Sequence, residues 1–183
     1  RHLQARRELL LGQLDRAEDA LTTLDPALLA PASRAIHELI AAGIALRRLR
    51  TERARAALTQ AELAARVAGI PALMAEVEQA TLVLNTPAAR LIGLGVQRPI
   101  LLDEVEALLA SDTLVVDGCR HAVRSAGREI ALASRPVLFA LARVLAEAWP
   151  QPAPRETLIE QAFRTAYFDE THRARLRVEI GRL

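Results

Sequence analysis

The stretch Asp169–Leu183, DETHRARLRVEIGRL, decides how the rest of the chain is interpreted. Leu176, Ile180 and Leu183 recur at positions i, i+4 and i+7, which is the spacing of one apolar face on an α-helix. Asp169, followed by a second acid, suits the start of this helix. A side-chain oxygen there accepts hydrogen bonds from free backbone N–H groups, and negative charge meets the positive end of the helix dipole. The pattern predicts a helix over residues 169–183 that packs through this stripe.

The remaining faces of the predicted helix are rich in arginine: Arg173, Arg175, Arg177 and Arg182. From Thr171 to Leu183 these side chains meet a single acid, Glu179, which leaves a local net charge of +3. A guanidinium group is a planar fork of donors that matches phosphates and the major-groove edge of guanine. In an isolated segment such a helix is more often a solvated packing helix, so the neighbouring sequence has to decide between the two interpretations.

Composition limits the fold and the class of protein. The chain has 183 residues, of which 51% are hydrophobic and only 3% aromatic, so its apolar mass is mostly Ala, Leu and Val and favours packed helices. No uninterrupted apolar run of membrane-spanning length and no signal-peptide pattern is present. The single Cys119 fits a reducing compartment. We therefore expect a cytoplasmic protein with no membrane partner.

Charge is distributed unevenly. All 24 basic residues are Arg, a usage that coding bias alone can produce, so no single arginine carries much weight. Residues 1–111 hold equal numbers of Arg and acids, and the whole net charge of +2 lies in residues 112–183. A small basic excess in one half is an unspecific sign of a polyanionic partner.

The first 111 residues predict helices separated by short breaks. Gly12, Pro26, Pro71 and Pro87 mark several of the interruptions, because proline and glycine end or interrupt helices. The predicted helices cover Leu3–Leu11, Asp15–Leu24, Pro31–Leu49, Thr51–Ala68, Pro71–Leu84 and Leu102–Ala110.

This half also contains a faint internal repeat. GQLDRAEDAL (Gly12–Leu21) aligns with LRTERARAAL (Leu49–Leu58), which superimposes the small and apolar positions of the two segments. The offset of 37 residues is close to the period of tetratricopeptide repeats. Residues 1–84 therefore resemble a degenerate tetratricopeptide-like array of antiparallel helical hairpins, with a generic antiparallel bundle as the alternative. Either architecture suits self-association or the binding of a protein or small-molecule effector.

No residues in the chain form a convincing catalytic or metal site. His37 lies between apolar neighbours, and the glycines of Gly93–Gly95 lack the third glycine and the helix start of a nucleotide loop. His121 and Cys119 are expected on one face of a strand as packing residues. No nucleophile, base and orienting group can be assembled, so we expect neither an enzyme nor a cofactor or metal ion.

At Leu114 the pattern changes to short β-branched runs. LVVDG predicts a strand, and CRHAVRSAGREIAL predicts a hairpin closed around Ser125-Ala126-Gly127. A helix follows from Pro136, with Leu138, Leu141, Leu145 and Ala148 as its expected buried stripe, and ends at Trp149-Pro150. A second helix is predicted over Arg155–Phe163, with Leu158, Ile159, Ala162 and Phe163 facing inward. The loop Arg164–Phe168 then leads to the arginine-rich helix.

Residues 112–183 resemble the winged-helix effector domain of OmpR/PhoB-type response regulators. The resemblance is carried by GREIAL (127–132), RPVLFALARVLAEA (135–148), PRETLIEQAF (154–163) and the pattern RLRVEIGRL at the end. It implies a short antiparallel sheet followed by three helices, the third of which lies in the DNA major groove. By position, Arg177, Val178 and Arg182 would face base edges, whereas His172, Arg173 and Arg175 would meet phosphates.

Three features depart from that family. Glu179 stands where a neutral or basic residue is usual, Gly181 interrupts the predicted helix, and the wing hairpin is expected beyond Leu183. The sequence thus predicts a mainly α protein with a helical domain over 1–111 and an α+β winged-helix domain over 112–183. The expected function is a dimeric, bacterial-type DNA-binding transcriptional regulator that binds double-stranded DNA. The alternative is a helical-repeat scaffold that binds protein instead of DNA.

Overall fold

The structure, a computed structural model, describes residues 1–165, 167 and 169–183. The fold is mainly helical, as the sequence predicts, and it contains two small antiparallel sheets, of which only the one after Leu114 was expected. The chain forms two compact units: Arg1–Ala89 with Ile100–Glu106, and Arg90–Pro99 with Ala107–Leu183. The sequence predicts a boundary between residues 111 and 112. In the structure, residues 90–99 and 107–111 belong to the second unit.

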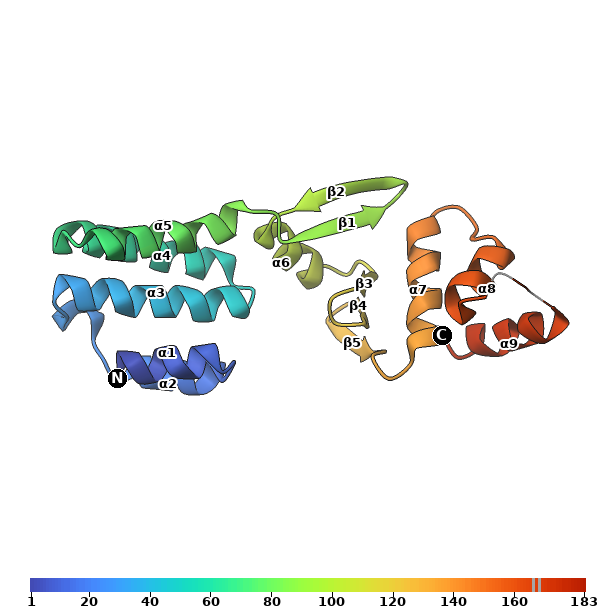
Figure 1. The fold of residues 1–183 in the computed structure, drawn as a ribbon, viewed down its shortest axis with the longest axis horizontal. Helices are drawn as coiled ribbons and strands as arrows, with labels where there is room; N and C mark the ends of the chain where they lie inside the picture. The colour runs from blue at the N-terminus through green and yellow to red at the C-terminus, as the bar shows by residue number, and fades with distance from the viewer. Residues whose placement is uncertain (166, 168) are drawn as a thin grey trace. The chain divides into compact units, whose positions relative to one another are not determined.

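The first unit consists of stacked helices (Figure 1). The helices expected from the sequence are present, with ends that differ by a few residues, and a short 3-10 helix is added. Pro31 and Pro71 each occupy a first helical position, where the missing N–H has no partner to lose. The elements are α1 (His2–Leu10), α2 (Leu14–Thr22), η1 (Pro26–Leu28), α3 (Pro31–Arg47), α4 (Thr51–Ala68) and α5 (Pro71–Asn85).

The two copies of the internal repeat occupy equivalent environments. All six aligned positions are buried: Ala17, Ala20 and Leu21 on α2, and Ala54, Ala57 and Leu58 on α4. The residues aligned at the start of each copy, Gly12 and Leu49, both have a positive φ, of 74° and 52°. Each copy therefore places a left-handed residue in the turn that precedes a helix with the same buried face.

The helices of the first unit approach closely through small side chains. A Cβ added to Gly43 on α3 would lie 2.8 Å from Cδ2 of Leu9 on α1, so the absence of a side chain lets Leu9 rest on the α3 backbone. Ala35, Ala61 and Ala65 are almost fully buried where α3 and α4 pack with α5. Alanine cores of this kind gain stability mainly through close helix contact, since each methyl group buries little area.

A carboxylate distant in sequence caps the start of α4. Oε2 of Glu106, on α6 (Leu102–Ala110), accepts hydrogen bonds from the Thr51 backbone N–H at 2.7 Å and from the Thr51 hydroxyl at 2.5 Å. Thr51 itself is 2% exposed. The hydrogen bonds from Thr51 lower the pKa of Glu106, because they stabilise its charged form. α4 thus receives from α6 the cap that its own preceding residue, Arg50, does not supply.

A β-hairpin lies where no strand was predicted. β1 (Ala89–Gly93) pairs with β2 (Val96–Ile100) across the turn Leu94-Gly95. Both turn residues have a positive φ, which matches the twist of a two-residue hairpin. The spacing of Gly93 and Gly95 indicated only a weak nucleotide loop, although a glycine between two short alternating runs is itself a hairpin signal.

The second unit contains a three-stranded sheet followed by three helices. The sheet has the order β3 (Val115–Asp117), β4 (Ala122–Ser125) and β5 (Arg128–Ala131), with Ser125 opposite Arg128. Ala126 and Gly127 have a positive φ, which confirms the predicted turn. Cys119 and His121 lie in the β3–β4 turn, so their expected place in a strand is wrong. The helices are α7 (Pro136–Ala148), α8 (Arg155–Phe163) and α9 (Glu170–Ile180).

The three helices meet around one apolar core. Its buried members are Leu141, Val144, Leu158, Ile159, Ala162 and Leu176. The stripe predicted for α7 is correct at Leu138 and Leu141, but Leu145 is 37% exposed and Val144 is buried in its place. The inward residues predicted for α8 are confirmed, with Phe163 only partly buried. Of the predicted loop at 164–168, Ala166 and Phe168 lie outside the described residues.

Across the described residues no helix is both long and apolar enough to cross a membrane.

Replacing Glu106 with Gln is expected to lower the free energy of unfolding of the first unit by about 1 kcal/mol at neutral pH, the usual value of a cap. Because the pKa of Glu106 is lowered in the folded chain, its contribution is fully present above the ordinary pKa of Glu and is lost as the pH falls through the lowered value. Urea denaturation followed by circular dichroism, from neutral pH to about pH 3, measures this difference.

Glu78→Gln is the matched control, since Glu78 is an exposed carboxylate on α5 of the same unit. It should leave stability within about 0.5 kcal/mol of the wild type at every pH. Equal effects of the two substitutions, or a Glu106→Gln difference that does not shrink in acid, would contradict the capping role.

Candidate nucleic-acid interface

The N-terminus of α9 is capped as the sequence predicts. Oδ1 of Asp169 accepts a hydrogen bond from the backbone N–H of His172 at 3.0 Å and lies 2.8 Å from Nδ1 of the same residue. These contacts lower the pKa of Asp169, the backbone hydrogen bond having the largest effect. The His172 ring is therefore held against the start of its own helix, with its centroid 6.0 Å from that of Phe163 on α8.

α9 packs on the core through one apolar side chain and not three. Leu176 is 4% exposed, whereas Ile180 and Leu183 are 44% and 50% exposed. The helix ends at Ile180, so Leu183 lies beyond it and the predicted stripe is wrong at two of its three positions. Gly181 terminates the helix. A Cβ there would meet the nearest backbone atoms at 3.6 Å, so no close approach requires glycine.

Two of the predicted arginines share one carboxylate. Glu170 lies in the first turn of α9, where its Oε2 is 3.3 Å from Nη1 of Arg173 and its Oε1 is 3.3 Å from Nη2 of Arg177. Their side chains remain 46% and 72% exposed. Glu170 thus joins two guanidinium groups that stand on successive turns of the same face, and holds both at the helix surface.

Arg182 lies beyond the end of α9 and bonds a second acid. Its Nη1 is 3.2 Å from Oε1 of Glu179, whose side chain is only 15% exposed. The Glu179 carboxylate therefore turns toward this arginine and leaves the solvent-facing side of the helix. Arg173, Ala174, Arg177 and Val178 are among the exposed residues of α9, together with Glu170, Thr171, Arg175 and Ile180.

Arg175 points toward α8. Its guanidinium carbon lies 4.7 Å from the centroid of the Phe163 ring, within the range of a cation–π contact. This contact fixes the side chain on the flank of α9 that faces Phe163. Of the six predicted site residues, five are exposed (Arg173, Arg175, Arg177, Val178 and Arg182), and His172 is partly buried.

The ion pairs on α9 reduce the charge that a polyanion would meet. Over residues 169–183 the four arginines are accompanied by Asp169, Glu170 and Glu179, which leaves a net charge of +1. Exposed pairs of this kind contribute only about 0–1 kcal/mol each, so a phosphate can displace the carboxylate at small cost. The surface can therefore bind an anion, but its paired state lowers the affinity for one.

Sequence reasoning missed the bridging role of Glu170 and the contact between Arg175 and Phe163. The spacing of Glu170 and Arg173, three residues apart on the helix, could have predicted the role of Glu170. The second depends on the packing of α8 against α9, which spacing does not give. Within the described part of the chain, no group of three or more His, Cys, Asp or Glu side chains could hold a metal ion.

Comparison of the chain with protein-family models, with curated proteins and with solved structures finds no match.

Leu176→Ala is expected to destabilise the second unit by about 2–4 kcal/mol, because it removes a buried side chain and leaves a cavity between α7, α8 and α9. Ile180→Ala, on the same helix, should cost less than about 1 kcal/mol, because Ile180 is largely exposed. Thermal or urea unfolding of the two variants checks the contrast. Similar losses would mean that α9 does pack through the broader stripe.

Proposed function

We propose that the chain is a DNA-binding transcriptional regulator of bacterial type that reads the major groove with α9. The observation that carries this proposal is the exposed surface of Arg173, Ala174, Arg177 and Val178 on the last helix of a three-helix core. This helix follows a three-stranded sheet in the order expected of a winged-helix domain. Arg177 and Val178 are both exposed on this helix, so both would be available to contact base edges.

The chemistry of these residues suits both parts of DNA recognition. Bidentate contact between arginine and guanine is the commonest specific contact and discriminates by about 1–3 kcal/mol. His172, Arg173 and Arg175 would contact phosphates, which gives affinity that depends on salt but not on sequence. Glu170 would release its two arginines when phosphates approach.

The helical first unit is proposed to serve as the interaction domain of this regulator. Its repeated burial pattern and paired left-handed turns support an array of tetratricopeptide-like hairpins. Such arrays expose surfaces for partners because each hairpin buries only the faces it shares with its neighbours. Dimerisation through this unit would pair two reading helices on two half-sites.

A helical scaffold that binds protein is the second candidate. Val178, Ile180 and Leu183 are each about half exposed on or just after α9, and carboxylates neutralise much of its charge. An apolar surface with paired charges at its edges also suits a protein partner.

The decisive experiment selects binding sites for the chain from a pool of random DNA duplexes and then measures affinity for the enriched duplex and for a scrambled one. Arg173→Ala combined with Arg177→Ala is expected to weaken the specific complex by about tenfold or more, in line with one lost phosphate contact and one lost base contact. The variant should also reduce the difference in affinity between the enriched and the scrambled duplex. Its affinity for DNA should fall less steeply as the salt concentration rises. Fluorescence anisotropy over a salt series measures all three quantities.

The control removes the same charge elsewhere: Arg55→Ala with Arg66→Ala on α4, both exposed arginines of the first unit. It should preserve the preference for the enriched duplex. Unchanged affinity and specificity in the α9 variant would overturn the proposed reading surface. Failure of the wild-type chain to bind any duplex at low salt would favour the scaffold.

A further inference from the structure

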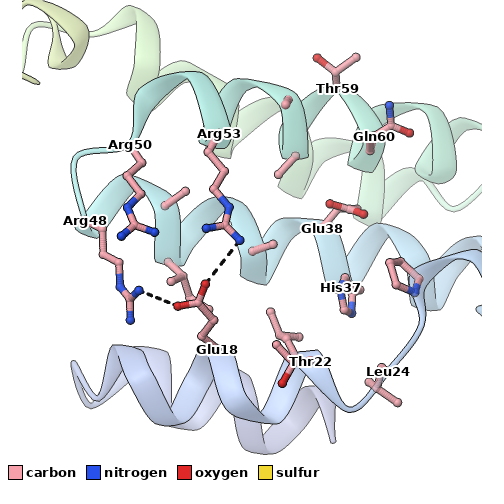
Figure 2. A pocket seen from close by; sticks show the side chains of 17 residues that line it. Glu18, Thr22, Leu24, His37, Glu38, Arg48, Arg50, Arg53, Thr59 and Gln60 are labelled. Atoms are coloured by element: carbon pink, nitrogen blue, oxygen red, sulfur yellow. Dashed lines mark ion pairs between the residues drawn. The ribbon is translucent and has the colours of Figure 1, made fainter.

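A pocket of about 600 Å³ lies within the first unit and has no role in the DNA-binding proposal (Figure 2). Residues of α2, α3 and α4, and of the segment between α2 and α3, line it. Its volume is in the range of sites for small organic ligands. The lining differs from one end to the other, and this difference indicates which ligand would fit.

Three guanidinium groups gather at one end of the pocket (Figure 2). Nη1 of Arg48 lies 2.6 Å from Oε2 of Glu18, and Nη2 of Arg53 lies 3.4 Å from Oε1 of the same carboxylate. Arg48 also bonds Asp15. The Arg50 backbone N–H donates to the Ala45 carbonyl, but its guanidinium group has no hydrogen bond or ion pair among the described residues. This end therefore keeps an unpaired cation beside two others, an arrangement that suits the forked contacts of a carboxylate.

Small apolar side chains line the middle of the pocket. Ala41 and Ala45 on α3 lie across from Ala56 and Ala57 on α4, and Leu21 on α2 adds a larger apolar contact. Because these alanine side chains are short, they leave room beside the packed helices α3 and α4, on the side that α2 lines. The middle can accept a short hydrocarbon chain but offers it few hydrogen-bonding partners.

The far end has polar groups that lack partners. His37 is 8% exposed, and its Nδ1 is buried without a hydrogen bond among the described residues. Burial lowers the pKa of His37, so its ring is neutral at neutral pH and has one nitrogen free to accept. Burial also raises the pKa of Glu38, and the charge of Arg34 opposes this more weakly; the Glu38 carboxylate has no ion pair within the described part of the chain. Buried polar atoms without partners are uncommon in folded proteins and call for one.

We infer that this pocket binds a small organic carboxylate with an apolar chain and an amino or other donor group at its opposite end. The carboxylate would bind at Arg50 between Arg48 and Arg53, and the chain would lie along the alanines. The donor group would reach Glu38, which precedes the apolar part of the pocket on α3. The inference rests on the proposed function only in giving the helical unit a signal-binding role, and its test does not involve DNA.

The test is isothermal titration calorimetry of the full chain with ω-amino acids of increasing length, from aminobutanoate through aminohexanoate to aminooctanoate. One length of the series is expected to bind once per chain and more tightly than hexanoate, which lacks the donor, or hexylammonium, which lacks the carboxylate. Arg50→Gln and Glu38→Gln should each weaken that ligand by about tenfold, the usual effect of losing one charged hydrogen bond.

Two controls separate this site from general attraction of charge. Arg66→Gln removes an exposed arginine of α4 outside the pocket and should leave binding unchanged. Hexanoate binding should weaken in Arg50→Gln but not in Glu38→Gln. Absence of saturable binding across the series, or equal losses in Arg66→Gln and Arg50→Gln, would overturn the site. Failure here leaves the DNA-binding proposal standing, because that proposal is tested through α9 alone.

Discussion

Close contact between alanine-lined helices is the constraint on which the first unit depends. With aromatic residues at 3% of the chain, few large side chains are present to fill a core, so α3 and α4 meet through residues such as Ala35, Ala61 and Ala65. Each methyl group buries little apolar area, so helix-to-helix fit matters more here than the size of any single side chain. Other alanines of the same two helices, such as Ala41 and Ala56, line the pocket beside α2. Packing and ligand space in this unit therefore have a common origin.

Arginine performs three different tasks in the fold. Arg48 joins α2 to the end of α3 through Asp15 and Glu18, Arg175 covers the ring of Phe163, and Arg177 stands exposed on α9. The residue type is the same in each place, so composition cannot separate them. The three arginines differ in the group that each guanidinium contacts. An arginine is available to a ligand where it has no carboxylate partner or only an exposed one.

The sequence predicted most of the helices because their apolar period and their prolines are local signals, as at Pro31 and Pro71. It also predicted the cap at Asp169, which needs only the next three residues. It could not predict that Leu145 and Ile180 would be exposed, because the choice between two apolar neighbours depends on where α7, α8 and α9 cross. The Glu106 cap on α4 joins residues 55 positions apart, and no local sequence pattern predicts it. The pocket likewise combines segments that are separate in sequence.

The attachment of α9 through Leu176 has a consequence for how the second unit opens. A helix held by a single buried apolar side chain can detach while α7 and α8 remain packed through Leu141 and Ile159. Its backbone amides should then exchange with deuterium well before those of α7, as expected of a local opening that needs less free energy than global unfolding. A ligand that binds the exposed surface of α9 would slow the exchange of these amides.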